Sequence, residues 1–352
     1  MNSNSKFFKN SKTLPVDKFF ENVLYDKKFG YYFSQFPFGD KGDFITSPRI
    51  SFLFSEIISL WMVATWELFE KPKNFNIIEL GPGDGNLTKI LIRSFKKFPE
   101  FDSIKKIFLY EKSKYLKKVQ KKNIANSNVK WISNLNNINN GPVIFFGNEF
   151  FDSIPIKQFK KVKSLLFEKN YTLEKNMIKE IFKKASRKDV KMISSYKTLQ
   201  KLNFIEFPKL GFKELKTITN KISKLNGCVL LIDYGYLKPN NQNTLQSVIK
   251  HKKNDILKNL GKADVTSHVN FKLLNEFFSK NGLKVKNIIT QKEFLEKMGI
   301  LERGNFLAKK MKFREQTDLY LRIKRLLSPS SMGNLFKVIL AYKSNKNKFF
   351  GF

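Results

Sequence analysis

Short apolar runs alternate with stretches of helical pattern over most of the chain. The runs that favour β-strands lie at residues 75–78, 104–110, 129–132, 142–146, 228–232, 283–289 and 335–342. Helical patterns lie at residues 86–97, 113–120, 271–280, 291–299 and 306–327. This alternation predicts an α/β fold, in which a mostly parallel sheet is covered by helices on both faces.

Three stretches depart from the alternation. Residues 156–206 break it first: residues 159–171 have the pattern of a β-hairpin, and the rest of this stretch is mixed and rich in lysine. Residues 237–270 show little apolar periodicity and are predicted to form a loop. Residues 1–13 lack the apolar centre of a signal peptide and are predicted to be a disordered polar tail.

The most apolar stretch, residues 50–69, is predicted to be a buried helix. Ser47 and Pro48 precede it and suit an N-cap and a first helical turn. Glu56 and several serines interrupt the apolar run, so a membrane-spanning helix is the less favoured alternative. We expect Glu56 to face a polar partner or a binding site, and the protein not to be integral to a membrane.

Composition narrows the functional classes. The 352 residues, 41% of them hydrophobic, suffice to bury a full core. One cysteine, Cys228, and two histidines exclude a disulfide framework and argue against a metal site, so no metal ligand is predicted. The net charge of +36 could indicate a nucleic-acid-binding or membrane-binding surface. However, the lysines are spread along the chain beside many Asn, Ile and Phe residues, a pattern typical of an A/T-rich genome.

Residues 79–85, ELGPGDG, directly follow the first predicted strand and precede a predicted helix. Glycines at alternate positions allow a sharp turn and let the backbone come close to a ligand. The spacing is G-x-G-x-G after an acid, which differs from the G-x-G-x-x-G that cradles a pyrophosphate. It suits a ligand with an amino group and no phosphate, such as S-adenosylmethionine. A simple tight turn is the alternative.

Glu111 ends the second predicted strand. The carboxyl end of that strand should lie beside the glycine loop, where an acid can accept hydrogen bonds from both hydroxyls of a ribose. Taken alone, Glu111 could equally be a surface glutamate among lysines. Together, the glycine loop and Glu111 predict a nucleoside-binding site.

Polar side chains also follow two later strands. Asn148, Glu149 and Asp152 come after the fourth predicted strand, and Asp233 comes after the fifth. Strand ends at one edge are where α/β sheets place their sites, so Glu149 and Asp152 could hold a cationic acceptor beside a sulfonium methyl group. Asn148 and Asp152 could instead cap a turn while the phenylalanines between them fill the core, and Asp233 could be a turn residue. The polar run at 263–270 is explained as well by capping of the next helix.

Several motifs together resemble those of the MidA family of class I S-adenosylmethionine-dependent methyltransferases, which includes an assembly factor of mitochondrial complex I. They occur in the family's order from about residue 15 to 343. The motifs are GDFITSP with IS at 42–51, ELGPGDG at 79–85, NEFFDSIP at 148–155, IDYGY at 232–236, ADVTSHVNF at 263–271 and SMG at 331–333.

The resemblance implies a Rossmann-like sheet of about seven strands and N-methylation of a protein arginine in a core subunit of respiratory complex I during assembly. The expected organisation is an N-terminal helical segment at 14–70 that packs on a methyltransferase domain at 71–345, with insertions at about 156–226 and 237–330. The expected partner is a protein substrate and not nucleic acid, and a homodimer is compatible with the pattern. The expected location is the bacterial cytoplasm, or the mitochondrial matrix in a eukaryote.

Predicted cofactor-binding residues come from the loop, the strand ends and the family pattern. They are Glu79, Gly81, Pro82, Gly83, Gly85, Glu111, Asn134, Leu135 and Asn148. Asn134 and Leu135 rest on the family pattern, which places them against the adenine and has Asp at position 134. The family also usually has Glu where this chain has Arg49, and Arg-Gly-Thr where it has Asp84-Gly85-Asn86. The glycines are intact, so we expect cofactor binding to survive.

Arginine methylation makes specific demands on a site. A guanidinium stays protonated, with a pKa above about 12, and is therefore a poor nucleophile. The site needs carboxylates that hold its N–H groups and accept the released proton. Glu149, Asp152 and Asp233 are the predicted catalytic residues, with Glu149 ranked first. The alternatives are a non-catalytic S-adenosylmethionine-binding assembly chaperone and, less favoured, an RNA methyltransferase.

Overall fold

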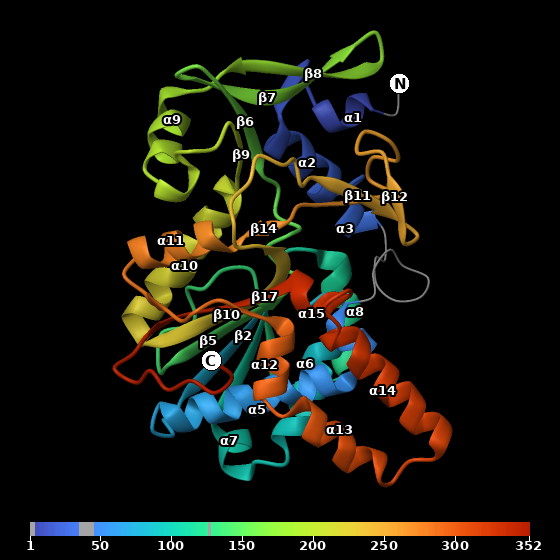
Figure 1. Ribbon diagram of the computed structural model, residues 1–352, viewed down its shortest axis with the longest axis vertical. Coiled ribbons are helices and arrows are strands. Elements are labelled where there is room, and N and C mark those ends of the chain that lie inside the picture. Colours follow the sequence, from blue (N-terminus) through green and yellow to red (C-terminus); the bar gives the residue numbers. More distant parts are fainter. Residues whose placement is uncertain (1–3, 35–45, 126–127) are drawn as a thin grey trace. The chain divides into compact units, whose positions relative to one another are not determined.

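The chain forms two compact units in the computed structural model, which describes residues 4–34, 46–125 and 128–352. The "hairpin unit" comprises residues 1–44, 151–215 and 236–277. The "sheet unit" comprises residues 45–150, 216–235 and 278–352, and it contains the glycine motif (Figure 1). Residues 42–45 of the first family motif lie outside the described residues.

This division differs from the predicted organisation. Residues 14–70 do not form one N-terminal segment, because residues 14–34 belong to the hairpin unit and residues 46–70 to the sheet unit. The predicted insertion at 237–330 is divided in the same way, near residue 277. Contacts between segments far apart in the chain decide this division, and no local pattern in the sequence reports them.

A mostly parallel sheet forms the centre of the sheet unit. Its strands are β2 (Phe75–Leu80), β3 (Lys105–Tyr110), β4 (Val129–Ile132), β5 (Val143–Asn148), β10 (Gly227–Tyr236), β15 (Lys284–Val285), β16 (Ile289–Thr290) and β17 (Phe336–Lys343). The order is β15-β17-β10-β5-β2-β3-β4, and β16 also pairs with β17. The five strands from β10 to β4 are parallel, and β17 is antiparallel to β10. The predicted α/β fold is confirmed.

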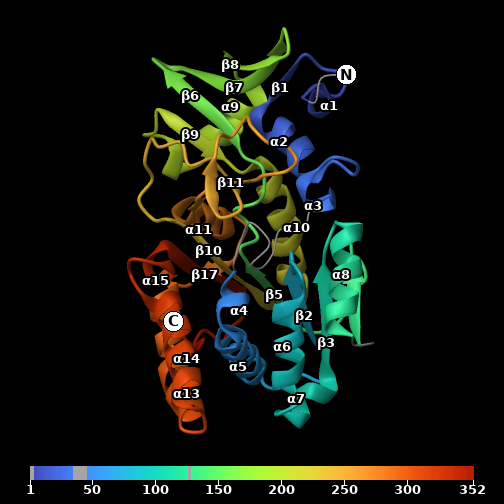
Figure 2. The same cartoon turned by 90° about the vertical axis from the view of Figure 1, so that its right-hand side faces the viewer.

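Helices cover this sheet. They are α4 (Ser47–Ile50), α5 (Phe52–Leu68), α6 (Asn86–Phe95), α7 (Pro99–Ile104), α8 (Lys114–Ile124), part of α10 (Lys209–Leu225), α12 (Gln291–Lys297), α13 (Ile300–Ala308), α14 (Phe313–Leu327) and α15 (Met332–Leu335). Figure 2 shows α6 beside β2, with α5 next to α6. Their apolar side chains share one core cluster with Ile77 of β2 and Leu109 of β3. This packing fixes the strand from which the glycine loop emerges.

Helix α5 is the buried helix that the sequence predicts, although it begins at Phe52 and not at residue 50. Ser51 caps it by accepting a hydrogen bond from Leu53 N, and the preceding residues form the separate turn α4. Glu56 is buried, and its carboxylate accepts a 2.9 Å hydrogen bond from Arg303 Nε. The expectation of a polar partner is confirmed. Within the described residues, no helix combines the length and apolar character needed to cross a bilayer.

The hairpin unit is built on antiparallel strands. Its elements are α1 (Ser5–Phe8), β1 (Thr13–Pro15), α2 (Val16–Tyr25), α3 (Tyr31–Ser34), β6 (Lys157–Val162), β7 (Leu165–Glu174), β8 (Met177–Lys184), α9 (Arg187–Ser194), β9 (Phe204–Phe207), β11 (Gln246–Ile249), β12 (Lys252–Asn254), β13 (Asp264–Thr266), β14 (Val269–Asn270) and most of α11 (Phe271–Lys280). Strands β6 and β7 pair antiparallel, which confirms the predicted hairpin.

Two predictions in this unit are wrong. The tail at 1–13 is not disordered throughout, because α1 buries Phe7 and Phe8 in a core cluster with Phe19. The loop at 237–270 contains the small sheet β12-β11-β13. Pairing with chain neighbours organises these short strands, so their sequences lack the periodicity of longer elements.

Candidate functional site

The glycine loop leaves the carboxyl end of β2 in a conformation that requires glycine. Gly81, Gly83 and Gly85 have φ values of +61°, +56° and +83°, in the left-handed region that side chains disfavour. A Cβ on Gly81 would also lie 2.9 Å from Cδ2 of Phe150. Gly85 N closes the turn by donating a 2.8 Å hydrogen bond to the carbonyl of Pro82. The loop therefore presents bare backbone at this edge of the sheet.

Gln120 of α8 ties the glycine loop to Glu111. Its Nε2 donates to the carbonyl of Gly83 at 2.8 Å and to Oε2 of Glu111 at 3.1 Å. Its Oε1 accepts a 2.9 Å hydrogen bond from Trp131 Nε1. Glu111 thus lies beside the loop, as the sequence predicts. Gln120 had no motif signal, and only the folded arrangement identifies it.

The Glu111 carboxylate is buried and already accepts hydrogen bonds from the protein. Besides Gln120, the backbone N of Ser113 donates to its Oε1 at 2.7 Å. Burial raises the pKa of Glu111, while hydrogen bonds from Ser113, Gln120 and the backbone of Lys112 act in the opposite direction. A carboxylate can accept about four hydrogen bonds, so the group retains capacity for a ribose hydroxyl.

Glu79 lies at the end of β2, directly before the glycine loop. It is 5% exposed, and the hydroxyl of Thr88 in α6 donates a hydrogen bond to its Oε2. Burial raises the pKa of Glu79 to about 7, Thr88 opposes that rise, and the nearby charge of Asp84 adds to it. A cationic amino group beside Glu79 would favour the carboxylate form.

Asn148 and Glu149 follow at the carboxyl end of β5. Asn148 Nδ2 donates to Glu149 Oε1 at 3.0 Å, and that oxygen also accepts a 3.2 Å hydrogen bond from Ser47 N. Asn148 Oδ1 is buried and accepts no hydrogen bond from any described residue. Buried polar atoms normally have a partner, so this acceptor fits an amino group of a bound ligand. With the bare glycine backbone and Glu79, it suits S-adenosylmethionine.

Glu149 and Asp233 lie on neighbouring strand ends. Glu149 N donates a 2.9 Å hydrogen bond to the carbonyl of Ile232, the residue before Asp233. Asp233 is 1% exposed, and its Oδ1 accepts a 2.9 Å hydrogen bond from Tyr234 N. Glu149 has a φ of +50°, an unfavourable conformation for a residue with a side chain. The structure therefore places two of the three predicted catalytic residues at neighbouring strand ends.

Asp152 belongs to the hairpin unit, in a group of acids and tyrosines. Its carbonyl accepts a 3.0 Å hydrogen bond from Ser267 N. Tyr32 OH donates to both oxygens of the buried Asp264, at 3.1 and 3.0 Å. The rings of Tyr25 and Tyr32 stack with their centroids 5.3 Å apart. Asp264 belongs to the polar run at 263–270, which from the sequence alone is explained equally well by helix capping. No sequence motif indicated Tyr25 or Tyr32.

Asn134 and Leu135 follow β4. Asn134 is exposed, and its Oδ1 accepts a 3.1 Å hydrogen bond from Asn136 N, which forms a local turn. Leu135 is buried, with 5% exposure. Their contact with an adenine stays a prediction.

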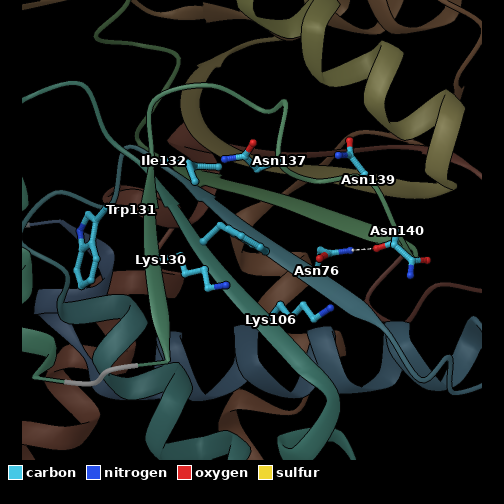
Figure 3. Close-up of a pocket in the computed structure, with 9 residues that line it drawn as sticks. Asn76, Lys106, Lys130, Trp131, Ile132, Asn137, Asn139 and Asn140 are labelled. Atoms are coloured by element: carbon cyan, nitrogen blue, oxygen red, sulfur yellow. Dashed lines mark hydrogen bonds between the residues drawn. The ribbon is translucent and has the colours of Figure 1, made fainter.

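A separate hollow of about 590 Å³ lies against β2, β3, β4 and the loop after β4 (Figure 3). Within it, Asn76 Nδ2 donates a 2.7 Å hydrogen bond to the carbonyl of Asn140. The lining residues are Asn76, Lys106, Phe108, Lys130, Trp131, Ile132, Asn137, Asn139 and Asn140. None of them is a predicted cofactor-binding residue, so the hollow has a different lining from the candidate site.

The parallel sheet, the glycine loop after β2 and the acids at neighbouring strand ends define a class I S-adenosylmethionine-dependent methyltransferase, with S-adenosylmethionine as its cofactor. Residues 57–289 match the family described as S-adenosyl-L-methionine-dependent methyltransferases, and the chain belongs to that family. This confirms the resemblance that the motifs indicate.

Relatives cover nearly the whole chain. It is 26% identical over 362 residues to the protein arginine methyltransferase NDUFAF7, mitochondrial, of Xenopus laevis, which covers 95% of this chain and 82% of the relative. The Homo sapiens protein of the same name is 26% identical over 365 residues, which cover 93% of this chain and 80% of the relative. A superfamily member from Burkholderia thailandensis, described as a methyl transferase and solved with bound S-adenosyl-homocysteine, superposes with a TM-score of 0.81 at 19% identity. The superposition covers 99% of this chain and 92% of that one. At that identity the likeness shows the fold.

Proposed function

We propose that this methyltransferase N-methylates an arginine side chain of a protein, in a core subunit of respiratory complex I during its assembly. The relatives' name, protein arginine methyltransferase, supports arginine as the acceptor. The family resemblance supports complex I as the target. The observation that carries the proposal is the pair of carboxylates, Glu149 and Asp233, at neighbouring strand ends of the sheet that bears the glycine loop.

In the proposed reaction, bound S-adenosylmethionine supplies the methyl group. Glu149 would accept hydrogen bonds from the guanidinium, which draws the positive charge toward the N–H groups that it contacts and away from the attacking nitrogen. As the nitrogen–methyl bond forms and S-adenosyl-homocysteine leaves, Glu149 would take up the proton that the methylated nitrogen releases. The hydrogen bonds from Ser47 N and Asn148 Nδ2 to Oε1 hold the carboxylate in one orientation. Asp233 adds a second negative charge that stabilises the cation. Most of the rate enhancement then comes from positioning the acceptor nitrogen.

The hairpin unit supplies a second group suited to a cationic protein segment. Asp152 and Asp264 provide carboxyl groups, and the stacked, half-buried rings of Tyr25 and Tyr32 provide aromatic surface. Arginine binds to carboxylates through its N–H groups and to aromatic rings through its flat face. We assign this group a part in binding the substrate protein, with Asp152 less important to the chemical step than Glu149.

The test is mass spectrometry of complex I subunits from three strains: wild type, a gene deletion, and the deletion complemented with Glu149→Gln. We expect a methylated arginine in the wild type that is missing from the other two. The amide oxygen of Gln can still accept the hydrogen bonds from Ser47 N and Asn148, so the variant should fold. Arginine methylation that persists in the deletion strain would refute the proposal. Restored complex I assembly with Glu149→Gln would favour the non-catalytic chaperone.

A further inference from the structure

Asp84 connects the glycine loop to the segment before α5. It is 7% exposed, and its Oδ1 accepts a 3.0 Å hydrogen bond from Asn86 N, which shapes the turn from the loop into α6. Its Oδ2 accepts a 2.9 Å hydrogen bond from Arg49 Nε and a second one from Arg49 Nη2. Two N–H groups of the Arg49 guanidinium therefore donate to the same oxygen of Asp84, and Asp84 lies between Gly83 and Gly85 in the chain.

Further hydrogen bonds join the same segments. Asn86 Nδ2 donates to the carbonyl of Pro48 at 2.9 Å, next to Arg49 in α4. From α8, Asn123 Nδ2 donates to the carbonyl of Asp84 at 2.9 Å. The loop is therefore held on one side by α4 and on the other by α8.

The ion pair between Arg49 and Asp84 is a charged link between α4 and the glycine loop. Replacing either residue alone by one of opposite charge would place two like charges together.

We infer that Arg49 and Asp84 are positioning residues, which hold the glycine loop in the shape that binds S-adenosylmethionine. Neither needs to touch the cofactor. Arg49 also balances the negative charge of Asp84, which otherwise acts on Glu79 in the same site. The inference rests on the proposed cofactor role of the glycine loop.

The test is a double-mutant cycle with Arg49→Met and Asp84→Asn, read out as the affinity for S-adenosyl-homocysteine by calorimetry. Asn at position 84 can still accept the hydrogen bond from Asn86 N, so the turn is retained. We expect each single change to weaken binding about tenfold or more, and the double change to weaken it little further, because one broken pair is shared. If the double variant instead loses affinity by the product of the two single losses, the two residues act independently and the inference is overturned.

A matched control separates positioning from stability. Arg303 and Glu56 form another ion pair in the sheet unit, with side-chain exposures of 26% and 8%, against 31% and 10% for Arg49 and Asp84. Arg303→Met should lower the thermal midpoint without changing the affinity of the folded protein. If Arg49→Met behaves in the same way, the pair is merely structural and the inference fails.

Two further variants complete the design. The exchange Arg49→Glu with Asp84→Arg restores attraction, so it should bind S-adenosyl-homocysteine at least about tenfold more tightly than either single charge reversal. Equal or weaker binding by the exchanged protein would count against the pair. Gly83→Val tests the loop itself: unchanged affinity there would refute the cofactor role of the loop, whereas lost affinity there with unaffected Arg49→Met would refute only the positioning role.

Discussion

Replacing Glu79 by Gln should make the cofactor-free protein more stable and the cofactor complex weaker. Glu79 is buried, and its pKa is raised from 4.5 to about 7. The native state therefore binds the Glu79 proton more tightly than the unfolded state, so protonation of Glu79 stabilises the native state. This stabilisation is fully present below about pH 4.5 and is lost as the pH rises toward 7.

The size of the stability change follows from the difference between the pKa values of Glu79 in the native and unfolded states. At about 1.4 kcal/mol per pH unit, a pKa rise from 4.5 to about 7 corresponds to about 3 kcal/mol at pH 8. Gln has no charge to bury and can still accept the hydrogen bond from Thr88. Glu79→Gln should thus gain about 3 kcal/mol over the wild type at pH 8 and almost nothing near pH 4.

The assay is urea unfolding of the cofactor-free wild type and variant between pH 4.5 and 8.5. The difference in unfolding free energy should grow with pH up to about 7 and then level off. Glu56→Gln is the control, because Glu56 is also buried but forms an ion pair with Arg303, so its loss should destabilise the protein. A pH-independent gap, or a Glu79→Gln variant less stable than the wild type at pH 8, would refute the reasoning.

Three further predictions concern single residues. Gly83→Val should abolish S-adenosyl-homocysteine binding while the circular dichroism spectrum stays native, since the loop must present bare backbone; calorimetry on the folded variant checks this. Glu111→Ala should weaken binding at least about tenfold if the carboxylate accepts ribose hydroxyls, and an unchanged dissociation constant would contradict that role. Glu149→Gln should keep cofactor affinity and lower turnover at least about a hundredfold; parallel loss of both would move Glu149 to the cofactor site.

Local patterns in the sequence predict much of the sheet unit. The run before ELGPGDG becomes β2, and the glycines take the left-handed conformations that their spacing indicates. Glu111 lies beside the loop because parallel strands align their carboxyl ends. These features depend on neighbours in the chain or on the general geometry of α/β sheets, and both can be read from residue order.

The sequence does not reveal features created by distant contacts. Gln120 bridges Glu111 and Gly83 only because α8 packs beside the loop. Tyr32 reaches Asp264 across more than two hundred residues of chain. In the same way, Arg49 and Asp84 are 35 residues apart in the chain and form an ion pair only in the fold. Side-chain pairs of this kind have no local signature.

Transfer of a labelled methyl group tests the central claim most directly. The purified protein and its Glu149→Gln variant would be incubated with trideuteromethyl S-adenosylmethionine and protein extract from cells that lack the gene. Tandem mass spectrometry of all products, RNA included, then locates the label. We predict label on an arginine side chain of a protein with the wild type and at least about a hundredfold less with the variant. Label on lysine or RNA, or none from a protein that binds S-adenosyl-homocysteine, would contradict arginine methylation by this site.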